Sequence, residues 1–118
     1  MATSILVVDD DSSFREAVSE LLRARGFEIA GHAADRNDAV AAVHMLGPDA
    51  VLLDIQLAVS NGFDVLRELV RTDDDLPVLL TSSDSGAASQ SLAIERGAVG
   101  FVPKGELADA DLRRYFAR

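Results

Sequence analysis

The chain has 118 residues, of which 48% are hydrophobic, so it can form one compact domain with a single core and has no room for a second. Its net charge of −9 excludes a basic nucleic-acid-binding surface, because contacts to phosphates need clusters of Lys and Arg, and here 11 basic residues face 20 acidic ones. No apolar run is long enough to span a bilayer, the N-terminus lacks a signal-peptide pattern, and there is no cysteine for a disulfide or a thiolate metal site. We therefore expect a cytoplasmic chain that binds neither nucleic acid nor membrane by itself.

The first half of the chain alternates between strand and helix patterns. Residues 4–8 form an apolar run that stops at Asp9, and residues 27–33 indicate a second strand, which we place at a sheet edge. The segment between these two runs has apolar side chains at helical spacing, which predicts a helix. A second helical pattern covers 35–46 and ends before Gly47. This alternation is typical of a parallel sheet with helical crossovers.

The stretch 49–54 is the centre of the predicted fold. Val51, Leu52 and Leu53 show no alternation of apolar and polar side chains, so both faces of this strand must be covered. The strand ends at Asp54, and parallel sheets bind ligands at the carboxyl ends of their strands. Asp54 is therefore the first candidate for a functional residue.

The second half continues the alternation. We expect a helix over 62–71, a strand over 78–82, a weaker helix over 85–96 that is rich in Ala and Ser, and a short strand over 99–102. A final helix is expected after the lysine loop, carrying Leu107, Leu112, Tyr115 and Phe116. Five strands and five helices in this order predict a doubly wound α/β fold of the flavodoxin-like type, with a five-stranded parallel sheet of order 2-1-3-4-5.

Three acids would meet in this fold. The topological switch point lies between the first and third strands, where Asp9, Asp10 and Asp54 would share one crevice. Near a protein surface each close pair of carboxylates repels by about 4 kcal/mol, so the cluster requires a proton or a cation. Oxygen ligands without His or Cys indicate a hard metal, Mg²⁺ first and Mn²⁺ second.

A hydroxyl and an ammonium group are expected on the far side of Asp54. Ser82 follows the fourth strand and Lys104 follows the fifth, although a shift of one residue would present Thr81 or Ser83 in place of Ser82. Both groups can bind phosphoryl oxygens, and a carboxylate can attack phosphorus to give an aspartyl phosphate. The crevice therefore predicts a phosphoryl acceptor site.

Asp9, Asp10, Asp54, Ser82 and Lys104, spaced over five strand–helix units, resemble the receiver domain of bacterial two-component response regulators. The resemblance covers residues 1–118. It implies that Asp54 accepts a phosphoryl group from a histidine kinase or a phosphotransfer protein, and that Ser82 and Lys104 bind the phosphoryl oxygens. It also implies that Asp10 binds Mg²⁺ directly with Asp54, while Asp9 acts mainly through metal-bound water.

The same resemblance gives roles to further residues. It implies that the Gln56 carbonyl completes the metal site, and that Phe101 is a switch whose ring turns inward as the Ser82 hydroxyl moves towards the phosphoryl group. Gln56 and Asp84 stand where this family tunes hydrolysis of the aspartyl phosphate. The face formed by the fourth helix, fifth strand and fifth helix would contact an output domain, an effector protein or a second copy in a homodimer.

The sequence departs from the family pattern at two loop positions. Gly105 stands directly after the lysine, and Ala58 stands four residues after the phosphoacceptor, where the family commonly has Pro. We expect both loops to be less rigid than usual, because Pro restricts the backbone.

Three other functions compete with that of a phosphoacceptor. A phosphorylation-independent interaction module on the same scaffold is compatible with Gly105 and Ala58. A phosphatase of the haloacid-dehalogenase type also uses an Asp nucleophile and Mg²⁺, but it needs Asp-x-Asp after the first strand, whereas Asp54 lies on the third and is followed by Gln56. A flavin carrier is disfavoured, since the acidic first turn would repel the flavin phosphate. We therefore expect an acceptor with autodephosphorylation, not a turnover enzyme.

Overall fold

The computed structural model describes residues 2–117 and contains one parallel sheet of order β2-β1-β3-β4-β5. Each neighbouring pair of strands in that order is parallel, which confirms the predicted topology and the edge position of β2. The strands are β1 (Ser4–Val8), β2 (Glu28–Ala33), β3 (Ala50–Asp54), β4 (Val78–Thr81) and β5 (Gly100–Phe101).

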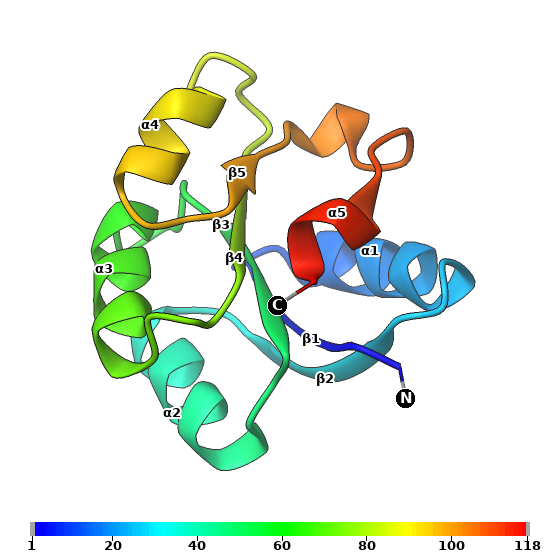
Figure 1. Cartoon of the computed structure of the whole chain (residues 1–118), viewed down its shortest axis with the longest axis horizontal. Helices are drawn as coiled ribbons and strands as arrows, with labels where there is room; N and C mark the ends of the chain where they lie inside the picture. The colour runs from blue at the N-terminus through cyan, green and yellow to red at the C-terminus, as the bar shows by residue number, and fades with distance from the viewer. Residues whose placement is uncertain (1, 118) are drawn as a thin grey trace.

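Helices cover both faces of this sheet. Figure 1 shows α1 and α5 on one side and α2, α3 and α4 on the other, which is the doubly wound arrangement. The helices are α1 (Ser12–Ala24), α2 (Arg36–Leu46), α3 (Gly62–Thr72), α4 (Gln90–Glu95) and α5 (Leu112–Phe116), with a 3-10 helix, η1, at Lys104–Glu106. None of the helices within residues 2–117 has the length and apolar character needed to cross a bilayer.

The core consists of two apolar layers separated by the sheet. Successive strand side chains point to opposite faces, so Leu53 packs in the layer with α2, α3 and α4, while Leu52 packs in the layer with α1 and α5. Both side chains are almost completely buried. The continuous apolar runs in the sequence therefore reflect strands that are covered on both faces.

Asp11 begins α1. Its Oδ1 atom accepts hydrogen bonds from the backbone N–H groups of Ser13, at 3.0 Å, and Phe14, at 3.3 Å. A side-chain oxygen at this position satisfies N–H groups that have no partner within the helix. The third acid of the Asp9–Asp11 run is thereby used as a helix cap.

Two helices are shorter than predicted. The helix predicted over 85–96 begins only at Gln90, because Asp84 folds the preceding residues into a turn: its carbonyl accepts from Ala87 N–H at 3.1 Å and its Oδ1 from Gly86 N–H at 2.9 Å. Ser89 then caps the helix by accepting from Leu92 N–H. Local hydrogen bonds of this kind compete with helix formation in a segment with few apolar anchors.

The predicted final helix is also interrupted. Leu107 lies after η1, and α5 begins only at Leu112. The guanidinium group of Arg25 donates hydrogen bonds to the backbone carbonyls of Ala108 and Ala110, and a continuous helix would direct these carbonyls to its own N–H groups. The prediction was wrong here because the break depends on an arginine more than 80 residues earlier in the chain.

The loop after β3 is tightly closed. Gly62 N–H donates to the Ile55 carbonyl at 3.0 Å, and Gln56 and Asn61 form an isolated antiparallel bridge. A Cβ atom at Gly62 would lie 2.2 Å from the Ile55 Cα atom, so only glycine allows this approach of the α3 N-terminus to the strand. These contacts fix the ends of the loop that contains Ala58.

Candidate functional site

Asp9, Asp10 and Asp54 converge at the carboxyl ends of the neighbouring strands β1 and β3, as predicted. Each offers a carboxylate oxygen, and these oxygens lie within 4.8 Å of one another. Asp9 and Asp54 are buried, whereas Asp10 is exposed at the rim. The site is therefore a cluster of two buried carboxylates and one carboxylate at the surface.

Backbone N–H groups orient all three carboxylates. Asp9 and Asp54 each accept a hydrogen bond from the N–H group two residues ahead, at 2.9 Å in both cases. Asp10 accepts from Ala58 N–H at 3.0 Å, which connects the first turn to the loop after β3. The loop in which Ala58 replaces the family's usual proline is therefore hydrogen-bonded directly to Asp10.

Lys104 bridges the two buried acids. Its Nζ atom lies 2.7 Å from Asp9 Oδ2 and 3.4 Å from Asp54 Oδ2, and its side chain is only 18% exposed. Its backbone N–H donates to the Ser82 carbonyl at 2.9 Å, which joins the ends of β4 and β5. Burial alone would lower the pKa of Lys104, but the hydrogen bond to Asp9 and the charges of Asp54 and Asp9 outweigh it, so the pKa lies above the usual value. Lys104 therefore carries a positive charge next to both buried acids.

The pKa of Asp54 is raised above its ordinary value, first because the carboxyl is desolvated by burial and further because Asp9 is negative. The hydrogen bond from Gln56 N–H and the positive charge of Lys104 act in the opposite direction without cancelling this effect. Ionisation of Asp54 consequently costs more in the folded protein than in water, and an additional cation would reduce this cost.

The donor set fits a hard divalent cation. The cluster provides carboxylate oxygens and no imidazole or thiolate, which is the ligand type that Mg²⁺ prefers. A second acidic group among residues 2–117, Asp73 to Asp75, comes from consecutive positions after α3 and is largely exposed. That second group is typical of a solvated turn.

Ser82 provides the buried hydroxyl near the site. Its Oγ atom donates to Gln56 Oε1 at 2.6 Å and accepts from Asp84 N–H at 3.0 Å. The Thr81 hydroxyl donates instead to the Val102 carbonyl, at 2.7 Å, and Ser83 is exposed. Of the three hydroxyls considered from the sequence, only that of Ser82 contacts the loop that follows Asp54.

Phe101 is 5% exposed and packs in the apolar layer formed with α2, α3 and α4. Its backbone N–H donates to Gln90 Oε1 at 3.0 Å, and Gln90 Nε2 donates to the Tyr115 hydroxyl at 2.8 Å. Gln90 thus joins α4, β5 and α5. Sequence reasoning missed this residue, because one Gln in a segment rich in Ala and Ser gives no distinctive signal.

Two further contacts to the site were not predicted. The Arg15 Nη1 atom donates to the Asp9 backbone carbonyl at 2.6 Å. The ring centroid of Phe14 lies 4.0 Å from Lys104 Nζ. In the sequence, Phe14 is indistinguishable from a core residue of an amphipathic helix, so its contact with the lysine requires the fold.

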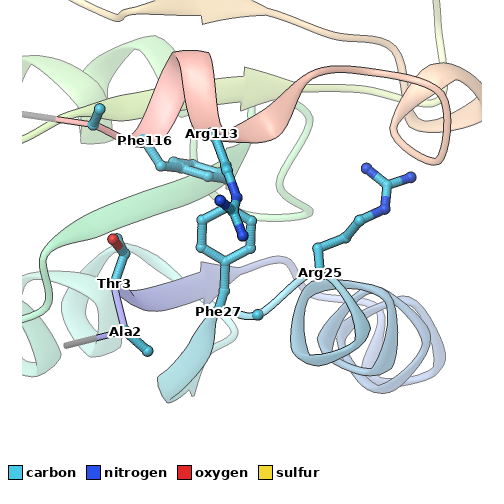
Figure 2. A pocket seen from close by; sticks show the side chains of 8 residues that line it. Ala2, Thr3, Arg25, Phe27, Arg113 and Phe116 are labelled. Carbon is cyan, nitrogen blue, oxygen red and sulfur yellow. The ribbon is translucent and has the colours of Figure 1, made fainter.

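A cavity of about 310 Å³ lies away from the acids, beside the amino end of β1. Figure 2 shows Phe27 and Phe116 in its wall, with ring centroids 5.6 Å apart in a T-shaped arrangement. The Arg25 guanidinium points away from these rings in the same view, consistent with its hydrogen bond to the Ala110 carbonyl. The three acids lie at the opposite end of the sheet, at the carboxyl ends of β1 and β3.

Comparisons with known proteins give one consistent family. The family model described as response regulator receiver domain matches residues 5–116. The DNA-binding response regulator MtrA of Mycolicibacterium paratuberculosis is 39% identical over 104 residues, covering 88% of this chain and 45% of that protein. A protein-glutamate methylesterase/protein-glutamine glutaminase of Pseudoalteromonas translucida is 37% identical over 107 residues, covering 88% of this chain and 27% of that protein.

A solved structure shows the same similarity. The two-component response regulator of the LuxR family from Aurantimonas sp. SI85-9A1 superposes with a TM-score of 0.86 at 27% identity, covering 96% of this chain and 81% of that one. The present chain spans less than half the length of the two curated relatives above. The acidic cluster is consistent with the Mg²⁺ site of receivers.

The raised pKa of Asp54 leads to a prediction about stability. A carboxyl whose pKa is higher in the folded state destabilises the fold above that pKa, and the penalty vanishes below the unfolded-state pKa of about 3.9. Asp54→Asn should therefore raise the free energy of unfolding in urea near pH 7, and the gain should shrink towards about pH 4.

The control for this measurement is Asp74→Asn, which removes one charge from an exposed turn of the same acidic chain. An equal gain in both variants at both pH values would show that net charge alone, and not the environment of Asp54, is responsible.

Proposed function

This chain belongs to the response regulator receiver domain family, and we propose that it acts as a phosphorylation-activated signalling switch in which Asp54 accepts the phosphoryl group. The observation that carries the proposal is the placement of Lys104 Nζ against both Asp9 and Asp54 at the cluster of the three acids. Receivers are phosphoacceptors and not turnover enzymes, so the phosphatase alternative is set aside.

In the proposed reaction, a carboxylate oxygen of Asp54 forms the new bond to phosphorus. The bond from phosphorus to the donor nitrogen or oxygen breaks, and the leaving group keeps the electron pair and takes up a proton. Lys104 stabilises negative charge on the transferring group, since its ammonium already contacts Asp54 Oδ2. The product is an acyl phosphate, which attack of water at phosphorus returns to the carboxylate.

Asp10, Asp54 and the Gln56 carbonyl are the proposed direct ligands of Mg²⁺, with Asp9 acting mainly through metal-bound water and with Mn²⁺ as a substitute. When bound, such an ion neutralises charge on the acids and on the phosphoryl oxygens. Asp10 is exposed, so a metal and a donor can approach the cluster from its side. The hydrogen bond from Ala58 N–H holds the Asp10 carboxylate in place without a proline in this loop.

The switch is proposed to run through Ser82 and Phe101. The Ser82 hydroxyl donates to Gln56 Oε1, so it must exchange this partner before it can donate to a phosphoryl oxygen. Movement of that hydroxyl pulls on the end of β4, which pairs with β5 at Phe101. Gln90, which holds both Phe101 and Tyr115, then transmits the change to α4 and α5.

The proposed partners follow from the family. A cytoplasmic histidine kinase or histidine phosphotransfer protein supplies the phosphoryl group. The face of α4, β5 and α5 contacts an output domain, an effector protein or a second copy of this chain. We propose that residues 1–118 act as one receiver domain; a role in DNA binding would require an output partner, because this chain has a net charge of −9.

Phosphorylation is tested directly with a small phosphodonor such as acetyl phosphate. With Mg²⁺, intact-protein mass spectrometry should detect one added phosphate on the wild type and none on Asp54→Ala. Chelation of the metal with EDTA should abolish the reaction, and Lys104→Met should slow it by about 100-fold, in the range that removal of one charge-stabilising group costs. Equal labelling of the wild type and Asp54→Ala would refute the assignment.

The lifetime of the aspartyl phosphate is expected to depend on Gln56 and Asp84. The Gln56 side chain accepts from Ser82 Oγ in the loop after Asp54. The Asp84 side chain accepts from Gly86 N–H at 2.9 Å and so holds the turn from which the Asp84 N–H donates to Ser82 Oγ. Gln56→Ala and Asp84→Ala should each change the rate of phosphate loss severalfold while labelling still reaches one phosphate. Decay is followed by the same mass measurement after removal of the donor.

Ser85→Ala is the matched control, since Ser85 is exposed in the adjacent turn. Decay rates of all three variants equal to that of the wild type would exclude a role of Gln56 and Asp84 in the lifetime.

A further inference from the structure

The ammonium group of Lys104 has three neighbours in the fold, and only two of them are carboxylates. Asp9 Oδ2 and Asp54 Oδ2 are these two, at 2.7 and 3.4 Å. The third is the ring of Phe14, whose centroid lies 4.0 Å from Nζ. At this distance the cation lies against the face of the ring, within the range of a cation–π interaction.

An aromatic ring satisfies the ammonium at this third position in a way that an aliphatic side chain cannot. An ammonium has three N–H donors and no acceptor, so a donor that faces an aliphatic group is left unpaired. The face of a phenyl ring is negative and attracts the donor, while the ring also keeps water away from it. With the Lys104 side chain only 18% exposed, little solvent is available to replace this contact.

Phe14 is held in place by contacts other than its contact with Lys104. It lies in the first turn of α1, which Asp11 caps by accepting from Phe14 N–H, and its ring packs against the apolar layer formed with α1 and α5. It also lines a groove of about 150 Å³ with Leu21, Lys104 and Leu107. The ring can therefore hold the ammonium even when the charges on the acids change.

We propose that Phe14 is a positioning residue for Lys104: its ring keeps the ammonium directed at Asp54 while the partners of the ammonium change from carboxylates to phosphoryl oxygens. This role rests on the proposed function of Asp54 as phosphoacceptor. In the unphosphorylated protein, Asp9 is the nearer partner of Lys104. A cation at the acids would compete for Asp9, and the ring then supplies a contact to the ammonium that does not depend on the charge of the acids.

The contact itself is measured by NMR on the metal-free, unphosphorylated protein. The ring current of Phe14 should shift the ε-methylene protons of Lys104 upfield. Phe14→Leu should remove this shift, because it retains apolar bulk without the aromatic face, whereas Phe14→Tyr should retain it. A wild-type shift that survives Phe14→Leu would show that the ring does not contact the lysine in solution.

The functional role is measured by phosphorylation kinetics with acetyl phosphate and Mg²⁺. Phe14→Leu should lower the phosphorylation rate constant about fivefold, the size expected for loss of one cation–π contact. Phe14→Tyr should restore it to within about twofold of wild type, and Leu21→Ala, which alters the same groove, should have no comparable effect.

A double-mutant comparison separates positioning from a general structural effect. In a Lys104→Met background, Phe14→Leu should cause no further loss of rate, because the lysine through which the ring acts is gone. An equal loss in both backgrounds, or a Phe14→Tyr variant as slow as Phe14→Leu, would overturn the role of Phe14 alone. Absence of phosphate on the wild type would instead overturn the proposed function and this role with it.

Discussion

The structure depends on one electrostatic arrangement, in which the ammonium of Lys104 lies between the buried carboxylates of Asp9 and Asp54. Without it, two buried negative charges would face each other beside a third at Asp10. The ammonium does not fully compensate for this environment, since burial, and after it the negative charge of Asp9, still raise the pKa of Asp54. The site therefore retains a preference for additional positive charge, which a divalent cation can supply.

The sheet creates this arrangement from segments far apart in the chain. The order β2-β1-β3-β4-β5 places the ends of β1 and β3 side by side and brings the loops after β4 and β5 to the same edge. Hydrogen bonds between these loops then link the groups, from Lys104 N–H to the Ser82 carbonyl and from the Ser82 hydroxyl to Gln56. A change of charge at Asp54 can thus reach β5 through few contacts.

Sequence patterns predicted which residues lie at the ends of the strands. They missed the features that are decided by contacts of individual side chains. The convergence of Asp9, Asp10 and Asp54 follows from topology alone, because apolar strands end where the acids begin. The predicted start of α4 and the predicted continuous last helix were wrong. The first is decided by hydrogen bonds that Asp84 accepts within its own loop, and the second by hydrogen bonds that Arg25, at the C-terminal end of α1, donates across the fold. Phe14 and Gln90 were missed for a related reason: their partners are close only in the folded chain.

The central claim is tested most directly by Mg²⁺ binding, measured by isothermal titration calorimetry on the wild type and two adjacent variants. Asp10→Asn removes an acid of the cluster, whereas Asp11→Asn changes a neighbouring acid that only caps α1, and Asn is an equally good cap. We expect Asp10→Asn to weaken Mg²⁺ binding by about tenfold or more, and Asp11→Asn to leave it within about twofold of wild type. Equal affinities for the wild type and Asp10→Asn would contradict the assignment of this cluster as a metal-dependent phosphoacceptor site.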